Sequence, residues 1–361
     1  MSHVPAMTYP EAMVVGLIQG VTELFPVSSL GHNVLIPALI GGTWARALNV
    51  AAPESPYLAF IVGLHVATAI ALLIYFWRDW VRIIKGFFTS IRDRDIVTTD
   101  QKLAWMIIVA TIPVGIVGLL FEHTFRVIFG KPVLAGVFLV ANGLILFTGE
   151  KFRTKASRQA DLEAAEERRL AIVPAEVQRE PAAGVAALGL AAAADGGATV
   201  GTPRRPGHGT HAAAKPDAKT ERAAELADAV RADRRLSKLD YLQTLIIGGA
   251  QILALLAGIS RDGVTMVAGM YRGLSREDAA RFAFLLATPV ILAAGALKTS
   301  DLITKGHGIY GPILAGSILS GIGAYISVRF LVRYFQTRTL TPFAIYCVLF
   351  GLGSIIYLQV K

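Results

Sequence analysis

Long apolar runs, separated by short charged stretches, form the dominant pattern of this chain. Six of the runs are long enough to cross a bilayer as a helix, which needs about 20 predominantly apolar residues. They cover residues 57–77, 104–121, 132–149, 281–298, 311–329 and 342–360. The composition agrees, because 54% of the residues are hydrophobic and only 17% are charged. The pattern predicts an all-α polytopic membrane protein.

One further apolar segment, Gly16–His32, carries polar and ionisable side chains, which are costly inside a bilayer. Gln19 and Glu23 stand four residues apart and therefore share one helix face. Pro26 then interrupts the helix. The residues after it are predicted to form a polar, non-helical loop that contains Ser28, Ser29, Gly31 and His32. The segment is thus predicted to be a half-helix that ends in a polar loop.

A second segment repeats this pattern 232 residues later. Gly16, Gln19, Leu24, Ser28 and Gly31 align without a gap with Gly248, Gln251, Leu256, Ser260 and Gly263. The side chains of the second copy that can take part in chemistry are Ser260, Arg261, Asp262 and Thr265. Interrupted apolar segments in both halves of a membrane protein indicate a site at a repeat interface. We therefore expect an inverted repeat with two re-entrant broken-helix hairpins, in addition to about six spanning helices.

A long segment of different composition joins the two halves. Residues 151–239 are rich in Ala, Arg and Glu, and then in Gly, Pro and His, with no sustained apolar stripe. This composition predicts a disordered or loosely helical cytoplasmic linker, with short charged helices at 160–170 and 221–236. The predicted domains are a membrane repeat with the first motif (1–150), the linker (151–239) and a membrane repeat with the second motif (240–361).

Basic residues indicate how the chain is oriented. Lys and Arg are concentrated in residues 78–102 and 329–338, which are predicted to be cytoplasmic loops by the positive-inside rule. Such loops account for the formal net charge of +9, and the sequence has no basic domain with interspersed aromatic residues, so nucleic-acid binding is excluded. A short connection is predicted over residues 122–131. The single Cys347 offers neither a disulfide framework nor a thiolate metal site.

The two motifs together carry the side chains of a phosphate site. Arg261 is permanently charged and presents a planar fork that suits phosphate oxygens, and amides around Gly258–Gly263 would add the positive end of a helix dipole. Glu23 can act as a base or a metal ligand, and His32 as a nucleophile or a proton carrier. Hydroxyls that can attack or donate hydrogen bonds belong to Ser28, Ser29, Ser260 and Thr265. A diphosphate beside carboxylates usually brings a divalent ion, for which Glu23 is the first candidate ligand.

These residues also have purely structural explanations. Gln19 can hydrogen-bond across helices, and the serines can cap backbone groups at the helix breaks. Glu23 and Arg261 can form a buried ion pair, although this leaves His32 and the duplicated loops unexplained. His65, inside the first predicted span, faces either a pocket or a neighbouring helix.

Both motifs resemble those of a known family. QGVTELFPVSSLGH and GISRDGVT resemble the signatures of the bacterial undecaprenyl-diphosphate phosphatases, the bacitracin-resistance type, in which (E/Q)xxxE, PxSSxGH and PGxSRSxxT carry the active site. FWR at 76–78 and PFAIY at 342–346 extend the resemblance over nearly all of the chain outside the linker. From the residues and this resemblance together, the catalytic candidates are Glu23, His32, Ser260 and Arg261. The substrate-binding candidates are Gln19, Ser28, Ser29, Gly258, Gly263 and Thr265, and the metal ligands are Glu23 and Asp262.

The resemblance implies a function and its setting. It implies removal of the terminal phosphate of undecaprenyl diphosphate with Mg²⁺ or Ca²⁺, which recycles the lipid carrier of cell-wall synthesis. It also implies a multi-pass protein of the bacterial plasma membrane, with an outward-facing active site and a role in bacitracin resistance. The expected partners are the polyprenyl diphosphate and the membrane; a homo-oligomer is compatible with the sequence, and nucleic acid is excluded.

The sequence departs from the family pattern at four positions. Gln19 stands where many members have Glu, which leaves one carboxylate fewer for a metal. Leu30 replaces a usual Thr, and Ala257 replaces a Pro. Asp262 replaces the Ser after Arg261, and it either supplies the missing metal ligand or pairs with Arg261 and weakens phosphate binding. The long linker is also outside the common pattern.

Three functional hypotheses follow. The first is a lipid diphosphate phosphatase, in which His32, a serine or a metal-activated water is the nucleophile. The second is a polyprenyl-phosphate transporter or flippase, because inverted repeats with broken helices are a transporter architecture. The third is a non-catalytic membrane scaffold that acts through the linker.

Overall fold

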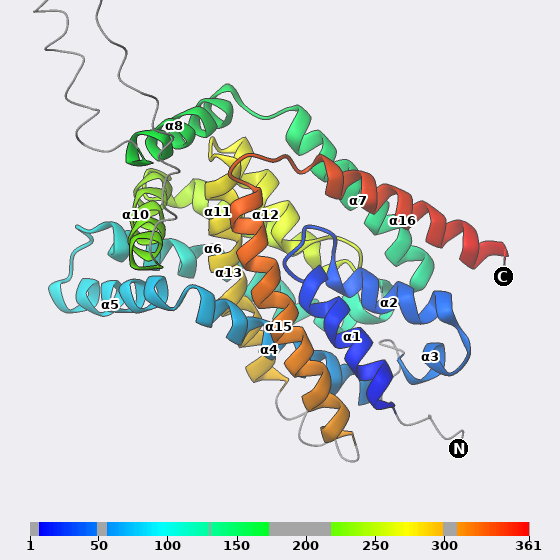
Figure 1. Cartoon of the computed structure of the whole chain (residues 1–361). Coiled ribbons are helices and arrows are strands. Elements are labelled where there is room, and N and C mark those ends of the chain that lie inside the picture. Colours follow the sequence, from blue (N-terminus) through cyan, green and yellow to red (C-terminus); the bar gives the residue numbers. More distant parts are fainter. Residues whose placement is uncertain (1–6, 49–55, 130, 173–217, 299–308, 361) are drawn as a thin grey trace, which may run out of the picture. The chain divides into compact units, whose positions relative to one another are not determined.

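The computed structural model describes residues 7–48, 56–129, 131–172, 218–298 and 309–360. Within these ranges, all regular secondary structure is helical (Figure 1). The first half contains α1 (Tyr9–Thr22), α2 (Ser29–Ile40), α3 (Gly42–Ala47), α4 (Pro56–Tyr75), α5 (Trp77–Asp93), α6 (Thr99–Phe129) and α7 (Pro132–Lys151). Next come α8 (Lys155–Ile172) and α10 (Ala218–Leu236). The second half contains α11 (Tyr241–Ala250), the 3₁₀ helix η3 (Gln251–Leu255), α12 (Arg261–Tyr271), α13 (Arg276–Leu297), α15 (Tyr310–Tyr334) and α16 (Thr341–Val360).

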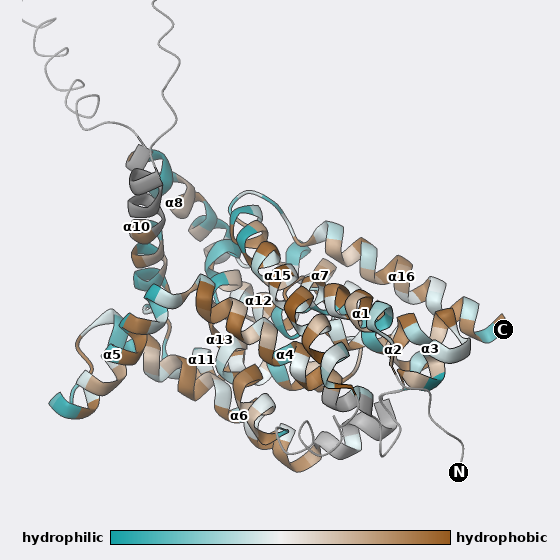
Figure 2. Ribbon diagram, turned by 60° about the horizontal axis from the view of Figure 1, so that its bottom comes forward, coloured by the Kyte–Doolittle hydropathy of each residue, from teal (hydrophilic) through white to brown (hydrophobic). Residues whose placement is uncertain are grey.

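These helices include the spans that the apolar pattern predicts. Five segments are long and apolar enough to cross a membrane, namely Thr99–Phe121 of α6 and the whole of α7, α13, α15 and α16. A sixth candidate is the α4–α5 pair, in which Phe60–Tyr75 and Trp77–Asp93 meet at an angle of 85°. Apolar residues predominate along these spans in Figure 2. For the described residues, the prediction of an all-α membrane protein with about six spans is therefore confirmed.

Residues 78–102, predicted to be a loop, instead form most of α5 and the start of α6. The exposed side of α5 has a stripe of apolar side chains and a basic stripe beside it. The apolar stripe contains Trp77, Val81, Ile84, Phe88 and Ile91, and the basic stripe contains Arg78, Lys85 and Arg92. Helices of this kind lie along a membrane surface. The prediction of a loop was wrong because the many basic residues obscured the helical period of the apolar ones.

The connection predicted over residues 122–131 is also mostly helical, since α6 continues to Phe129. The break in the first motif is likewise shorter than predicted. Only residues 23–28 separate α1 from α2, so Ser29, Gly31 and His32 lie in the first turn of a helix rather than in a loop. Ser28 restarts the helix immediately after the break, because its hydroxyl caps the first turn.

Close packing of the half-helices depends on glycine at two equivalent positions of the repeat. A Cβ on Gly16 in α1 would lie 2.2 Å from the carbonyl oxygen of Gly316 in α15. A Cβ on Gly248 in α11 would lie 2.1 Å from the carbonyl oxygen of Ala110 in α6. Small residues permit such a close approach of helix backbones. The polar half-helix of each half therefore packs on a spanning helix of the other half.

The chain divides into two units. The first consists of Met1–Asp161 and Ala232–Lys361 and contains the membrane helices, whereas the second consists of Leu162–Arg231. Most of α8 and α10 belongs to the second unit, and both helices coincide with the short charged helices expected from the sequence. They are more hydrophilic than the spans (Figure 2). Residues 173–217, for which disorder was predicted, lie outside the described residues.

The residues on either side of the second unit belong to the first unit, and ion pairs connect them to its helices. Asp233 near the end of α10 is fully buried and lies 2.6 Å from Nη2 of Arg82 in α5 and 2.9 Å from Nη2 of Arg281 in α13. Asp161 of α8 pairs with Nη1 of Arg276 in α13 at 2.6 Å. The ends of the linker are therefore integral to the structure of the membrane unit.

Candidate active site

The two helix breaks end in equivalent caps. Oγ of Ser28 accepts a hydrogen bond from the amide of Gly31 at 3.2 Å, and Oγ of Ser260 accepts one from the amide of Gly263 at 3.2 Å. The free amides of each first turn and the helix dipole create a positive potential there. The two breaks are adjacent, because a Cβ on Gly31 would lie 3.0 Å from Cα of Gly258. The fold thus brings together two helix N-termini, each suited to a phosphate oxygen.

Both breaks contain unusual backbone conformations. Ser28 has a φ of 67°, in the left-handed region that residues other than glycine rarely occupy. Gly258 has a φ of 117°, and a Cβ there would lie 2.4 Å from the carbonyl oxygen of Ala135 in α7. Such conformations persist only where the surrounding structure imposes them, and they concentrate at functional sites. Gly258, a predicted binding residue, is therefore required for the shape of its loop.

Asn142 in α7 connects the two breaks. Its Nδ2 donates to the carbonyl oxygen of Pro26 at 3.0 Å, and its Oδ1 accepts from the amide of Ser260 at 2.9 Å. The side chain is fully buried. The motif analysis missed this residue, although a single amide inside an apolar span is a signal that could have identified it.

Glu23 and Arg261 join the two motifs. Glu23 lies at the C-terminal end of α1, and Arg261 is the first residue of α12. Nη2 of Arg261 donates to Oε1 of Glu23 at 2.9 Å, and the two side chains are only 15% and 5% exposed. The acid and the guanidinium that the sequence placed in different halves therefore meet in one buried pair.

The second carboxylate oxygen of Glu23 accepts hydrogen bonds from its own half of the chain. Nε2 of Gln19 donates to Oε2 of Glu23 at 2.8 Å, and the hydroxyl of Ser29 donates to the same oxygen. Oε1 of Gln19 in turn accepts from Nδ2 of Asn33 at 2.5 Å, which fixes the orientation of the amide. The predicted binding residues Gln19 and Ser29 are thus in direct contact with the predicted base.

His65 of α4 contacts this cluster and thus faces the neighbouring helix α1, one of the two alternatives that the sequence left open. Its Nε2 lies 3.4 Å from Oε2 of Glu23 and 3.4 Å from Nε2 of Gln19. Its Nδ1 is 2.8 Å from the carbonyl oxygen of Ile61 and therefore carries the hydrogen. His65 thereby adds an imidazole to the site from a helix outside both motifs.

His32 has a different set of partners. Its Nδ1 is 2.7 Å from the carbonyl oxygen of Ser28, and its Nε2 is 2.7 Å from the hydroxyl of Tyr346 in α16. Its ring also stacks on those of Tyr346 and Phe350, at centroid distances of 5.7 and 5.1 Å. Tyr346 belongs to the PFAIY segment and was not among the predicted site residues.

Two predicted residues of the second motif have distinct environments. Oδ1 of Asp262 accepts from Nε of Arg261 at 3.4 Å, whereas its buried Oδ2 has no hydrogen-bond partner among the described residues. The hydroxyl of Thr265 donates to the carbonyl oxygen of Arg261 at 2.7 Å. Thr265 therefore stabilises the first turn of α12 in the structure, and Asp262 retains an oxygen that can bind a further group.

The described part of the chain contains no cluster of three or more His, Cys, Asp or Glu side chains that could hold a metal ion by themselves. Glu23 and Asp262 are nevertheless both in contact with Arg261, and Asp262 has the unpartnered Oδ2. Mg²⁺ is commonly held by one or two carboxylates together with phosphate oxygens and water. The donor set fits an ion that arrives with a diphosphate.

The chain is similar to known proteins over most of its length. The family described as bacitracin resistance protein BacA matches residues 12–173 and 218–353. The chain belongs to this family. The match includes both motifs, the spans between them, and the two positions from α7 and α16, Asn142 and Tyr346, that complete the site.

Individual relatives of the BacA family match nearly end to end. A protein of Mycolicibacterium paratuberculosis named undecaprenyl-diphosphatase is 51% identical over 356 residues, which cover 98% of this chain and 99% of the relative. A Frankia alni protein named undecaprenyl-diphosphatase 2 is 51% identical, with 96% of each chain covered. A Chromobacterium violaceum protein with the same name is 35% identical over 96% of this chain and 98% of the relative.

Proposed function

We infer that the protein is an integral membrane phosphatase that hydrolyses undecaprenyl diphosphate to undecaprenyl phosphate and inorganic phosphate, which recycles the cell-wall lipid carrier. The observation that carries this function is the contact between Glu23 and Arg261 beside two helix N-termini, in a family whose near full-length relatives are named undecaprenyl-diphosphatases. The transporter alternative rests on the broken helices alone and is not favoured by these relatives.

The phosphate groups bind between the two caps. Arg261 turns from Glu23 toward the terminal phosphate and donates two hydrogen bonds to it. Amides of the first turns of α2 and α12 donate to the remaining oxygens. The hydroxyls of Ser28 and Ser260 accept hydrogen bonds from these turns, so their own hydrogens are available to the substrate. This arrangement stabilises the negative charge that develops on the phosphate as it is transferred.

Ser29 is the nucleophile, because its hydroxyl donates to the carboxylate of Glu23 and this is the geometry of a nucleophile beside its base. Its oxygen bonds to the terminal phosphorus while the bond from phosphorus to the bridging oxygen breaks. Glu23 accepts the hydroxyl proton and transfers it to the departing undecaprenyl phosphate. Water then attacks the phosphoserine; Glu23 accepts a proton from this water and returns it to the oxygen of Ser29 as inorganic phosphate leaves.

A divalent cation, Mg²⁺ or Ca²⁺, would be held by Glu23 and Asp262 together with oxygens of the diphosphate. When bound, it would neutralise part of the substrate's negative charge. The support is the buried Oδ2 of Asp262, which has no hydrogen-bond partner among the described residues and would supply the carboxylate oxygen that Gln19 lacks.

The arrangement of the halves and their orientation are part of the proposal. Gly16 and Gly248 are equivalent positions of the two motifs. Gly16 packs on α15, the second of the three spans after the second motif, and Gly248 packs on α6, the second of the three spans after the first motif. This exchange is what an inverted repeat with two re-entrant hairpins requires. By the positive-inside rule, the basic stripe of α5 and the basic residues 329–338 support a cytoplasmic location for those segments and the linker, and we propose that the active site opens outward.

Phosphate release from a polyprenyl diphosphate by the purified protein in detergent tests the function. The assay contains Mg²⁺, Ca²⁺ or a chelator. Glu23→Gln and Arg261→Ala are each expected to lower kcat by about 100-fold or more. Arg92→Ala removes an exposed arginine of α5 and is expected to leave the rate unchanged. Near wild-type rates in both site variants would contradict the proposal.

Acid quenching with substrate radiolabelled at the terminal phosphate tests the nucleophile. The wild-type protein is expected to retain label, and Ser29→Ala is expected to retain none and to lose about 100-fold in kcat or more. Ser260→Ala, the hydroxyl of the equivalent motif, is the matched control, because it should slow the reaction but still become labelled. Rapid turnover by Ser29→Ala would instead exclude Ser29 as the nucleophile.

A further inference from the structure

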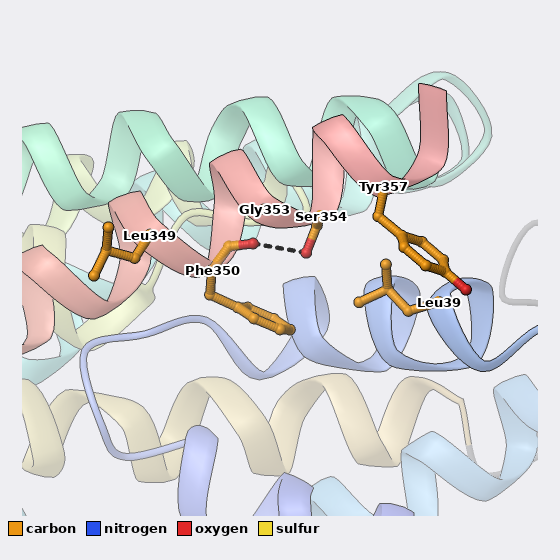
Figure 3. Close-up of a pocket in the computed structure, with 6 residues that line it drawn as sticks. All are labelled: Leu39, Leu349, Phe350, Gly353, Ser354 and Tyr357. Carbon is orange, nitrogen blue, oxygen red and sulfur yellow. Dashed lines mark hydrogen bonds between the residues drawn. The ribbon is translucent and has the colours of Figure 1, made fainter. Parts of the chain in front are cut away.

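An open groove lies between α2 and α16 (Figure 3). It has a volume of about 320 Å³ and is lined by Leu39, Leu349, Phe350, Gly353, Ser354 and Tyr357. Leu39 points from α2 toward α16, while Phe350 and Tyr357 point from α16 toward α2 (Figure 3). The groove therefore has one wall from the re-entrant hairpin and one from the last spanning helix.

The groove adjoins the candidate active site through one of its lining residues, Phe350. Phe350 forms part of its wall and also stacks on the imidazole of His32, with 5.1 Å between the ring centroids. His32 lies in the same helical turn as Ser29, the residue that contacts Glu23. From Phe350 the groove continues to Tyr357, a rise of roughly 10 Å along α16 at 1.5 Å per residue. One end therefore lies beside His32, and the other lies toward the end of the span.

The surface of the groove is apolar. The hydroxyl of Ser354 donates to the carbonyl oxygen of Phe350 at 2.7 Å, so it offers little polarity to the space (Figure 3). Leu349 and Tyr357 are 66% and 48% exposed and lie on the outside of a spanning helix. In a membrane this exposed side meets hydrocarbon rather than water. The groove is therefore open to the bilayer along its length.

We propose that the groove binds the isoprene units of the substrate that are nearest to the diphosphate. This assignment rests on the proposed function, because it takes the occupant to be the polyprenyl chain of the hydrolysed lipid. A diphosphate bound between the caps of α2 and α12 must extend its apolar chain away from charged groups, since contact between them is unfavourable. The groove offers the chain an apolar path away from the site, and this path starts at Phe350, beside His32.

Gly353 allows this assignment to be tested with little disturbance of the fold. It lines the groove, and a Cβ built on it meets no atom of the described residues within 4 Å. The variant Gly353→Phe would therefore place a ring in the groove rather than against a neighbouring helix. Gly118 of α6 is the matched control, because it also lies in a spanning helix and its Cβ also meets no atom within 4 Å.

The experiment compares undecaprenyl diphosphate with dimethylallyl diphosphate, whose single isoprene unit would reach only the Phe350 end of the groove and not Gly353. Gly353→Phe is expected to raise KM for the long substrate about tenfold, through lost apolar contact, and to leave kcat/KM for the short one within about twofold. Gly118→Phe should change neither substrate. Leu39→Phe fills the groove from the α2 wall and repeats the test should Gly353→Phe prove unstable in size-exclusion chromatography.

The outcomes separate this proposal from the proposed function. A wild-type protein that releases phosphate from neither substrate would overturn the function itself. A wild-type protein that hydrolyses both, with blocked-groove variants that affect both substrates equally or neither, would overturn the groove assignment alone. The second result is also the one expected if the groove holds only an acyl chain of the bilayer.

Discussion

The two hydrogen-bond partners of His32 indicate its role. Its Nδ1 carries a hydrogen, because the carbonyl oxygen of Ser28 can only accept. In the neutral imidazole, Nε2 then accepts the hydrogen of the Tyr346 hydroxyl. A nucleophilic His32 would need that same lone pair for attack. These contacts support the role that we propose for His32, which is to position Ser28 and the first turn of α2.

Tyr346→Phe tests this role, because it removes the hydroxyl and keeps the ring that stacks on His32. We expect kcat to fall by about three- to tenfold, from the loss of one hydrogen bond that orients the imidazole, while KM stays the same. Steady-state kinetics over a range of pH measures both parameters. Tyr325→Phe, an outward-facing tyrosine of α15, is the control. A higher kcat in Tyr346→Phe would indicate that the freed Nε2 attacks the phosphate.

Sequence reasoning from the two motifs named residues that the structure brings together, but it did not name the residues of other spans that contact them. Glu23 and Arg261 were expected to share one site, and they do so because each lies at the break of its own half-helix. The motifs do not point to Asn142, Tyr346 or the position of His65, since these residues come from spans in other parts of the chain. Of the three, Asn142 had a signal of its own, as a single amide inside an apolar span. An apolar run shows that a span exists, but it does not show which of its faces meets the motifs.

At the level of helices, α1 and α15 pack so closely that one added methyl group should disrupt their contact. A Cβ on Gly16 would lie 2.2 Å from a backbone oxygen of Gly316, which a side-chain rotation cannot relieve. Gly16→Ala is therefore expected to destabilise the protein by about 1–3 kcal/mol and to lower its melting temperature in detergent. Gly248→Ala should have a similar effect, because Gly248 makes the equivalent contact with Ala110 of α6.

Gly118→Ala is the matched control for these two variants, since a Cβ on Gly118 meets no atom within 4 Å in the part of the chain that the structure describes. It should leave the melting temperature unchanged or raise it slightly through the higher helix propensity of alanine. An unchanged melting temperature in Gly16→Ala and Gly248→Ala would show that the helices separate easily and that close packing of α1 and α11 is not needed.

The sequence predicted helices well where one physical signal was strong and poorly where two signals competed. Each of the predicted spans coincides with a helix, because bilayer length imposes long apolar runs. Residues 78–102 have the spacing of a helix but the charge of a loop, and the structure follows the spacing. The start of α2 depended on one capping side chain, Ser28, in a rare backbone conformation, which an apolar pattern cannot reveal.

At the scale of the whole molecule, the active site requires both halves of the chain. Each half contributes one charged partner and one helix N-terminus, and each half-helix packs on a span of the opposite half. Because the halves must meet in one arrangement, we expect both ends of the segment that connects them to be attached to the membrane unit. The ion pairs of Asp161 and Asp233 provide these attachment points.

Asp233→Ala should reveal how much the protein depends on the second of these points. The substitution leaves Arg82 and Arg281 without one carboxylate, but Asp79 still contacts them at 2.7 and 3.0 Å. We therefore expect a loss of about 2 kcal/mol, below the 3–5 kcal/mol of an isolated buried pair, measured as a lower melting temperature. Replacing residues 173–217 with a Gly/Ser segment of equal length leaves every described ion pair in place and should change neither stability nor phosphate release. A replaced linker that abolishes activity, together with an unchanged melting temperature in Asp233→Ala, would mean that the linker acts in catalysis rather than through its anchored ends.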